Sequence, residues 1–148
     1  MITIKRVEDL DEKTRITLEI MNALPEWFSP PEDIVNKSVE HRECPFIAAF
    51  DGDKAIGFAA LKIHNEYTAD VYNLGILREY HRKGFGHRIM EECVQYCKEN
   101  GYKFLTVKTL DESAVYEPYD STRAFYKKEG FYPIEVFTTF WDEENPCL

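Results

Sequence analysis

The chain has 148 residues, of which 44% are apolar and 30% are charged, so it can form one packed core and is unlike a disordered chain. Its 18 Lys and Arg stand against 27 Asp and Glu, and the net charge of −9 argues against nucleic acid as a partner and favours cationic partners. The N-terminus lacks the apolar core of an export signal and no run of about 18 apolar residues occurs, so we expect a cytoplasmic protein with no membrane partner.

Local signals predict the elements in chain order. Alternating residues indicate a strand at the N-terminus, and Pro25 ends the helix that follows it. The turn 51–54 (Asp-Gly-Asp-Lys) indicates a hairpin, and Gly130 ends the last helix, which Asp120 or Ser121 caps. The predicted order is strand 2–6, helices 11–23 and 29–41, strands 46–51, 55–63 and 69–77, helix 84–100, strand 103–109, helix 120–129 and strand 131–140.

This order predicts a single α/β domain over residues 1–148, built on a mixed, mostly antiparallel central sheet flanked by helices. No linker or internal repeat interrupts it. The strand 69–77, the helix 84–100 and the strand 103–109 form a β-α-β unit, so the two strands should be parallel.

The cysteines do not have the spacing of a metal site. Cys93 and Cys97 are separated by a helical spacing rather than by the C-x-x-C spacing of metal sites, and no pattern that includes histidine resembles a zinc site. We therefore expect free thiols and no metal ion.

The segment 74–88 combines a strand end, a basic turn that contains Gly84 and Gly86, and the start of a helix. Unpaired N–H groups at a helix start carry partial positive charge, and glycines let them approach an anion closely. The turn could therefore hold a pyrophosphate, although a basic turn that simply caps an amphipathic helix is an equally weighted interpretation. The cations that crowd the segment are Arg78, Arg82, Lys83 and Arg88.

Two common nucleotide-binding motifs do not fit this segment. The P-loop pattern G-x-x-x-x-G-K-[ST] is absent, and a dinucleotide-binding turn would need a third glycine where Ile89 stands. Asp111 lies too far along the chain from Gly84 to fit the ribose-binding acid of that fold.

The strand L-x-I followed by H-R-K-G-F-G resembles motif A of the GNAT superfamily of N-acetyltransferases, usually written [RQ]-x-x-G-x-[GA]. His81 departs from the first position of that motif. A second match, over residues 122–131, resembles the late helix of the superfamily with its Y-x-x-x-G-F signature. The tail W-x-x-x-N-P-C-L at 141–148, together with residues 24–28, resembles a poorly characterised small subgroup of the superfamily.

The resemblance implies a GNAT-like acyl-CoA acyltransferase fold and an N-acetyltransferase that moves an acetyl group from acetyl-CoA to an amine by direct transfer. The implied acceptor is a small molecule or a peptide, and relatives are often homodimers. A non-catalytic acyl-CoA-binding regulatory domain on the same fold is the alternative.

The resemblance also implies the positions that bind the cofactor. Pantetheine would run along Leu74, Gly75 and Ile76, and Gly75 would either form a bulge in the strand or pack closely against a neighbour. The phosphates would lie on the basic turn. The positions that match the phosphate loop are Arg82, Lys83, Gly84, Phe85, Gly86 and His87.

Tyr126 matches the frequent general acid of the superfamily, and an ordinary tyrosine pKa of ~10 keeps the side chain protonated at neutral pH. Packing beside Phe125 is the alternative role. Asp70 is the candidate general base, and simple alternation places it on the same strand face as Leu74 and Ile76. A solvated carboxylate at the start of the strand is the alternative interpretation of Asp70.

Trp27 and Phe28 lie where relatives build one wall of the acceptor cleft. Two adjacent aromatic residues in a loop flanked by prolines could form such a wall. They could equally form a hydrophobic plug over the sheet.

Overall fold

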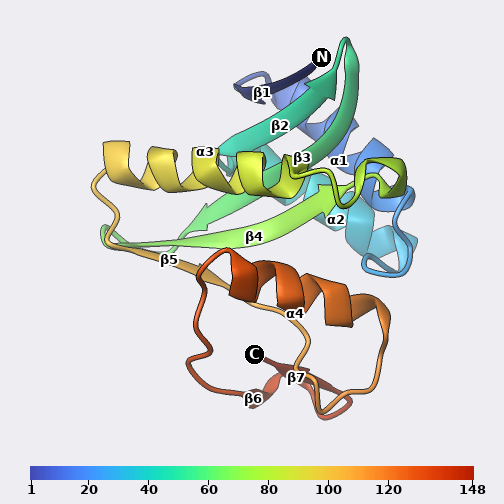
Figure 1. Ribbon diagram of the computed structural model, residues 1–148, viewed down its shortest axis with the longest axis vertical. Coiled ribbons are helices and arrows are strands. Elements are labelled where there is room, and N and C mark those ends of the chain that lie inside the picture. The colour runs from blue at the N-terminus through green and yellow to red at the C-terminus, as the bar shows by residue number, and fades with distance from the viewer. The chain divides into compact units, whose positions relative to one another are not determined.

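The computed structural model describes residues 1–148 as two compact units, Met1–Leu105 and Thr106–Leu148 (Figure 1). The first unit holds most of the central sheet, and the second holds one helix and a two-stranded sheet. The single domain expected over residues 1–148 stays a prediction.

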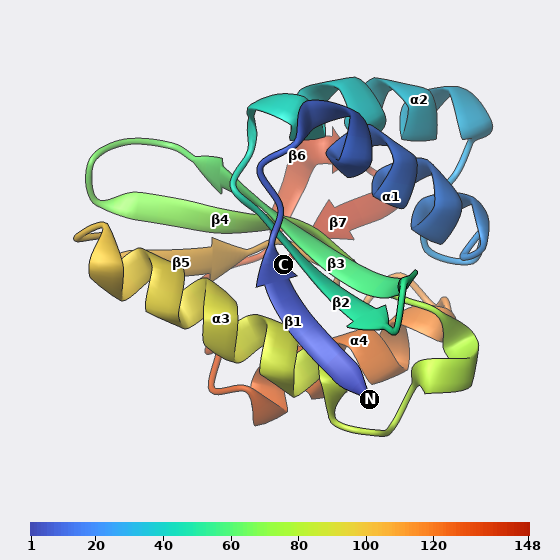
Figure 2. The same cartoon turned by 90° about the horizontal axis from the view of Figure 1, so that it is seen from above.

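The central sheet has five strands in the order β1-β2-β3-β4-β5 (Figure 2). Neighbouring strands from β1 to β4 are antiparallel. β5 follows β4 in the chain through one helix, a crossover that joins parallel strands, so the sheet is mixed as the sequence predicts. The strands are β1 (Ile2–Arg6), β2 (Phe46–Asp51), β3 (Lys54–Ile63), β4 (Thr68–Ile76) and β5 (Phe104–Val107).

Helices cover both faces of this sheet in the first unit. Figure 2 shows α1 and α2 on one face and α3 on the other. No helix of the chain combines the length and the apolarity that crossing a membrane requires. The helices of this unit are α1 (Leu10–Asn22), α2 (Pro31–Glu40) and α3 (Phe85–Glu99), with short 3-10 helices η1 (His41–Glu43) and η2 (Arg78–Tyr80).

The core lies around β2 and β3, which are buried on both faces along most of their length. Small residues in these strands let the helices approach closely. At Gly57 an added Cβ would lie 3.0 Å from Ile76 Cγ1 and 3.3 Å from Ile89 Cδ1, so a side chain there would disturb the contact between β3, β4 and α3.

β4 contains a bulge in the middle of its pairing with β3. Ala60 lies opposite Asn73, whereas the next residue of β3, Leu61, lies opposite Val71. Tyr72 is therefore an extra residue in β4, and such an insertion interrupts the alternation of side chains between the two faces.

The second unit contains α4 (Pro118–Lys128) and an antiparallel pair of strands, β6 (Phe137–Asp142) and β7 (Asn145–Cys147). The C-terminal segment also pairs with the chain that follows β5. The N–H of Thr109 donates to Leu148 O at 3.0 Å, and the N–H of Leu148 donates to Thr109 O at 2.8 Å. The backbone of the tail motif is thus hydrogen-bonded to neighbouring segments of the chain. Membership of the small subgroup that this motif resembles stays a prediction.

Two boundaries expected in this unit are wrong. The last strand, expected over 131–140, begins only at Phe137, and Pro133 lacks the N–H that a strand ladder needs. α4 begins at Pro118 rather than Asp120, because proline has a fixed φ that suits the first turn of a helix. Glu117 takes the N-cap position, without a side-chain hydrogen bond to the helix.

Candidate functional site

The turn between β4 and α3 contains two residues in the left-handed region of backbone conformation. Arg82 has a φ of 60° and Gly84 a φ of 82°. Glycine adopts this region without steric cost, and an added Cβ at Gly84 would meet nothing within 4 Å, so the backbone is open there. Residues whose backbones alternate between the two hands direct successive N–H groups into a shared concavity that suits an anion.

The start of α3 has no capping side chain. Its N-cap is Gly84, and its first turn contains no acidic residue. By contrast, Asp9 caps α1 by accepting a hydrogen bond from the N–H of Glu12 at 2.9 Å. Because the first helical bond of α3 is donated by the N–H of Arg88 to Gly84 O at 3.2 Å, the preceding N–H groups have no partner within the helix. No acidic residue in the first turn of α3 offsets the partial positive charge of this terminus.

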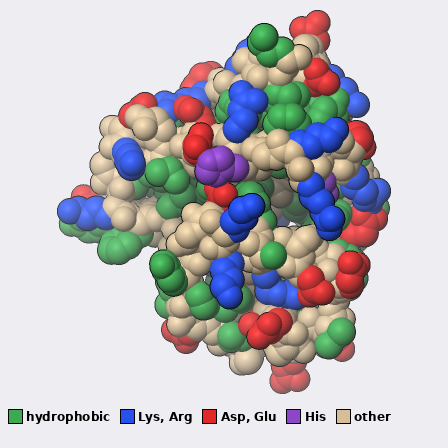
Figure 3. All heavy atoms as spheres, viewed as in Figure 1, with side chains coloured by type: hydrophobic (Ala, Val, Ile, Leu, Met, Phe, Trp, Pro, Cys, Tyr) green, Lys and Arg blue, Asp and Glu red, His purple; other side chains and the backbone are tan.

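The four cations of the turn differ in their contacts with the rest of the protein. Arg78 forms an ion pair with Glu26, and Arg88 donates to the backbone oxygen of Ile2 at 3.2 Å. Figure 3 shows Lys and Arg side chains (blue) interspersed with Asp and Glu (red) on one face of the molecule. Arg82 and Lys83 are exposed, and Lys83 Nζ lies 5.8 Å from the centre of the Tyr80 ring. Arg82 and Lys83 are thus the cations best placed to meet a phosphate.

His81, which departs from the family motif, is held by the protein itself. Its Nε2 lies 2.5 Å from Ile76 O, and since a carbonyl oxygen can only accept, the imidazole donates. The ring also makes an edge contact with Trp27, with ring centres 5.9 Å apart. This side chain therefore closes the turn against the end of β4.

The pairing of β4 with β3 shows no bulge at Gly75, and the close-packing alternative describes that residue. Gly75 lies in regular register opposite Phe58. An added Cβ would lie 3.1 Å from Ile20 Cγ2, 3.3 Å from Phe28 Cε2 and 3.4 Å from Leu24 Cδ1. Glycine at this position lets α1 and the loop after it pack directly on β4, next to Leu74 and Ile76 on the same strand.

Asp70 lies on a different face of β4 from the one expected. The bulge at Tyr72 places Tyr72 and Gly75 on the side of α1 and α2, while Ile76 contacts the opposite side, near Ile89 of α3. Asp70 precedes Tyr72 by two residues and shares its face, so it does not share the face of Ile76. Its side chain is 2% exposed, so the interpretation of Asp70 as a solvated carboxylate is also wrong.

Tyr72 is part of a charged cluster between β4 and α2. Its hydroxyl donates to Glu40 Oε2 at 2.5 Å and accepts a hydrogen bond from Lys37 Nζ. Lys62 Nζ lies 4.9 Å from the centre of the same ring. Burial and the hydrogen bond to Glu40 raise the pKa of Tyr72, so its hydroxyl stays protonated.

His41 is buried beneath this cluster and was not singled out by the sequence, where an isolated histidine has no distinguishing pattern. Its Nδ1 lies 2.8 Å from Thr17 Oγ1, and its Nε2 lies 2.8 Å from Asn73 Nδ2. Burial, with a smaller contribution from Lys37, lowers the pKa of His41 to about 4. The neutral ring therefore links α1 to β4 at the residue that follows the bulge.

Trp27 and Phe28 lie next to residues expected to bind the cofactor. Both are half-buried, and their N–H groups donate to Leu24 O at 3.1 and 3.0 Å, which continues a helical turn beyond α1. Trp27 contacts His81 and Phe28 approaches Gly75, so the structure brings this loop against both β4 and the basic turn.

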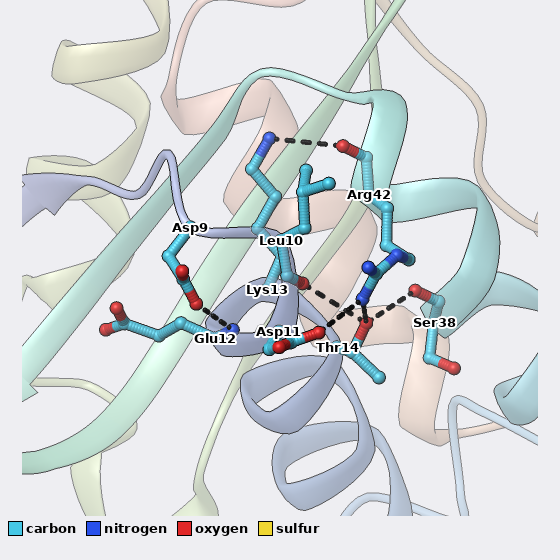
Figure 4. A network of polar contacts seen from close by, with 8 residues as sticks. All are labelled: Asp9, Leu10, Asp11, Glu12, Lys13, Thr14, Ser38 and Arg42. Atoms are coloured by element: carbon cyan, nitrogen blue, oxygen red, sulfur yellow. Dashed lines mark hydrogen bonds and ion pairs between the residues drawn. The ribbon is translucent and has the colours of Figure 1, made fainter.

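Polar contacts join the start of α1 to the segment that follows α2 (Figure 4). Arg42 donates to Asp11 Oδ1 and to Thr14 Oγ1, both at 3.0 Å. Lys13 Nζ donates to Cys44 O at 2.8 Å and to Arg42 O at 3.4 Å. These contacts tie the start of α1 to the segment that follows α2.

Tyr126 lies on α4 in the second unit. Its ring makes edge contacts with Phe125 and Phe131, with centres 5.5 and 5.7 Å apart. The packing expected as the alternative role is therefore present, and the role of Tyr126 as general acid stays a prediction. In the same unit, burial raises the pKa of Tyr119.

Comparison with known proteins decides the family. The model of the acetyltransferase (GNAT) family matches residues 8–131. The chain belongs to this family. The uncharacterised N-acetyltransferase YsnE of Bacillus subtilis is 27% identical to this GNAT chain over 145 residues, which cover 95% of this chain and 93% of YsnE.

Solved structures of GNAT proteins have the same fold. A GNAT-family protein from Desulfovibrio desulfuricans matches with a TM-score of 0.83 at 19% identity, over 99% of this chain and 95% of that one. The PaiA N-acetyltransferase from Thermoplasma acidophilum, solved in complex with coenzyme A, matches with a TM-score of 0.72 at 21% identity, over 99% of this chain and 96% of that one. This GNAT chain is therefore an acetyltransferase by family, with the central mixed sheet of that fold.

Proposed function

We propose that the protein transfers an acetyl group from acetyl-CoA directly to the nitrogen of an amine. The observation that carries the proposal is the start of α3, where left-handed Gly84 and an uncapped helix terminus lie beside the exposed cations Arg82 and Lys83. This arrangement suits the phosphates of coenzyme A, because backbone N–H groups and exposed cations both favour an anion. The coenzyme A bound to PaiA, a protein of the same fold, agrees with this choice of ligand.

The remaining residues have roles in the proposed reaction. The backbone of Leu74, Gly75 and Ile76 would hold the pantetheine, and the N–H groups at Phe85, Gly86 and His87 would complete the phosphate cradle. Trp27 and Phe28 would form one wall of the acceptor cleft. In the transfer, a C–N bond forms at the thioester carbonyl while the C–S bond breaks.

Two protons must move in this reaction. Asp70 would accept one from the attacking amine, and Tyr126 would donate one to the departing thiolate. Because Asp70 is almost fully buried and does not share the face of Ile76, it would act on the amine through a water molecule rather than by direct contact.

The acceptor is proposed to be a cationic small molecule or a peptide amine. The net charge of −9 favours a positively charged partner over an anionic one. The net charge acts through the whole surface of the protein, so it selects a class of acceptor rather than an individual compound.

Calorimetry followed by a thiol-release assay tests the proposal. Coenzyme A and acetyl-CoA should bind, and thiol should be released faster with at least one member of a panel of polyamines, amino sugars and basic peptides than without an amine. Binding without release across the panel would favour the non-catalytic acyl-CoA-binding domain. Absence of binding would overturn the proposal.

A further inference from the structure

Two cations of the basic turn, Arg78 and Arg88, already bind other groups of the protein. Arg78 forms an ion pair with Glu26, whose side chain is 37% exposed against 49% for Arg78. Arg88 reaches the backbone of Ile2. An arginine that is neutralised by a carboxylate contributes little net field to an approaching anion, so the four cations of the turn should not share one role.

The residues opposite this turn belong to the loop between α1 and α2. Glu26 meets Arg78, and the neighbouring Trp27 meets the edge of His81. His81 is itself held to Ile76 O, which fixes its ring relative to β4. Two adjacent residues of the loop, Glu26 and Trp27, therefore contact two residues of the turn.

We propose that Arg78 and His81 are positioning residues that hold the acceptor loop, and that they do not bind the phosphates of the cofactor. The inference rests on the proposed function, which places the acceptor wall at Trp27 and the phosphates on the turn. It divides the basic turn into a phosphate-binding pair, Arg82 and Lys83, and a loop-holding pair, Arg78 and His81. Substitutions in the second pair then change use of the acceptor and leave cofactor affinity in place.

The first experiment measures how well Trp27 is shielded. The chain has two tryptophans, so the variant Trp141→Phe leaves Trp27 as the only reporter. In that background, Arg78→Gln should increase the ratio of open to closed loop by roughly two- to fivefold, the factor that an ion pair of this exposure is worth, and so raise the acrylamide quenching constant of Trp27. Glu26→Gln should also raise the quenching constant of Trp27, and it leaves the residues of the turn unaltered. It replaces Arg78→Gln in the experiment if that variant folds poorly.

The double variant and a matched control sharpen this experiment. Glu26→Gln combined with Arg78→Gln should expose Trp27 no more than either change alone, because both remove the same contact. His81→Asn should expose Trp27 as well, while Arg82→Gln should leave the quenching constant unchanged. Equal quenching in the parent and in all the variants would overturn the inference.

The second experiment measures coenzyme A binding by calorimetry. Arg82→Gln should weaken binding by roughly tenfold or more, as expected for a lost charged hydrogen bond, whereas Arg78→Gln should stay within about threefold of the parent. An equal loss in both variants would make Arg78 a phosphate ligand and overturn the inference. If the parent itself does not bind coenzyme A, the proposed function fails, while the quenching result still decides whether Arg78 holds the loop.

Steady-state kinetics complete the test with any amine that supports thiol release. Arg78→Gln should raise the KM for that amine and leave the KM for acetyl-CoA near the parent value. Arg78→Lys, which retains the charge opposite Glu26, should recover part of the loss. A change in the KM for acetyl-CoA alone would contradict the proposed role.

Discussion

Gly84 and Gly75 lie at the two ends of the segment expected to bind the cofactor, and they are glycine for different reasons. Gly84 has a left-handed backbone in open surroundings. Gly75 has neighbours within 3.4 Å of the position that a Cβ would occupy. Substitutions should therefore act on ligand binding at Gly84 and on packing at Gly75.

Gly84→Asp should abolish binding of coenzyme A in a folded protein. The added carboxylate would repel phosphates, and the added Cβ would meet no atom of the protein within 4 Å. Asparagine tolerates the left-handed region and has the shape of aspartate without the charge, so Gly84→Asn is the matched control and should bind with an intermediate affinity. Calorimetry measures both, and parent-like affinity in Gly84→Asp would show that the phosphates bind elsewhere.

Tyr126→Phe should lower kcat by roughly 10²–10⁴-fold, the usual contribution of a general acid. The change removes only the hydroxyl, so the ring contacts with Phe125 and Phe131 and the affinity for coenzyme A should persist. We expect kcat and kcat/KM to fall together, because the interaction forms in the transition state. Asp70→Asn is the companion variant. Near-parent turnover in Tyr126→Phe, with a verified acceptor, would limit this residue to packing.

His41 should make the protein less stable as the pH falls below neutral. Its pKa is 6.5 in the unfolded chain and about 4 in the fold, so the unfolded state binds more protons between these values. The stabilisation is complete above pH 6.5 and is lost as the pH falls toward 4, up to roughly 3 kcal/mol. Lys37 and Glu40 face the ring and act in opposite directions on its pKa, Lys37 lowering it and Glu40 raising it.

Urea unfolding across this pH range measures the effect. His41→Gln should be less stable than the parent at pH 7.5 but should lose less stability on acidification. His64→Gln, at an exposed position, is the control and should keep the parent slope. Parallel curves for the parent and His41→Gln would exclude His41 as the source of the pH dependence.

At the scale of elements, β4 determines where the candidate residues point. Its bulge at Tyr72 reverses the expected face of Asp70, and its close contact with α1 depends on Gly75. The loop after α1 reaches the same strand through Phe28. The position of the proposed acceptor wall therefore depends on how α1 packs on β4, rather than on the loop alone.

Gly75→Ala should destabilise the protein by about 1–3 kcal/mol, because the new methyl group would be forced against Ile20 and Phe28. Phe28→Leu removes one of the close atoms, so the double variant should cost less than the sum of the two single changes. Thermal or urea unfolding measures each free energy. Additive costs would show that the methyl group and the Phe28 ring do not meet.

At the scale of the whole molecule, the acidic surface and the basic turn act on the cofactor in opposite directions. The net charge of −9 disfavours anions in general, whereas Arg82, Lys83 and the terminus of α3 form a local exception. Selectivity among anionic ligands should therefore come from fit to this turn rather than from charge.

Acetyl-CoA should stabilise the protein against unfolding, and ATP and NAD should not. A ligand at ~100 times its Kd adds about 2.7 kcal/mol. For a chain of this size the gain corresponds to a rise in Tm of about 5–10 °C. Differential scanning measures the shift at matched ligand concentrations. An unchanged Tm with saturating acetyl-CoA, or an equal rise with ATP, would contradict a specific acyl-CoA site.

The sequence by itself determined the fold class, the order of the elements from β1 to α4 and the basic turn at the start of α3, whereas the pair of strands β6 and β7 was expected as one strand over 131–140. These features depend on local signals, such as the hairpin at 51–54 and the glycine at 84, because turn and helix conformations are encoded within a few neighbouring residues. The family motif around Gly84 is likewise contiguous in the chain.

The tertiary structure alone decided which of these residues meet. The pairing of Arg78 with Glu26, the burial of His41 between α1 and β4, and the face of Asp70 depend on the register of β3 with β4 and on the packing of α1. An insertion of one residue in β4 is invisible to a pattern of alternating residues, because it is defined only by the strand that pairs with it. Contacts between distant segments follow from packing, which no local propensity specifies.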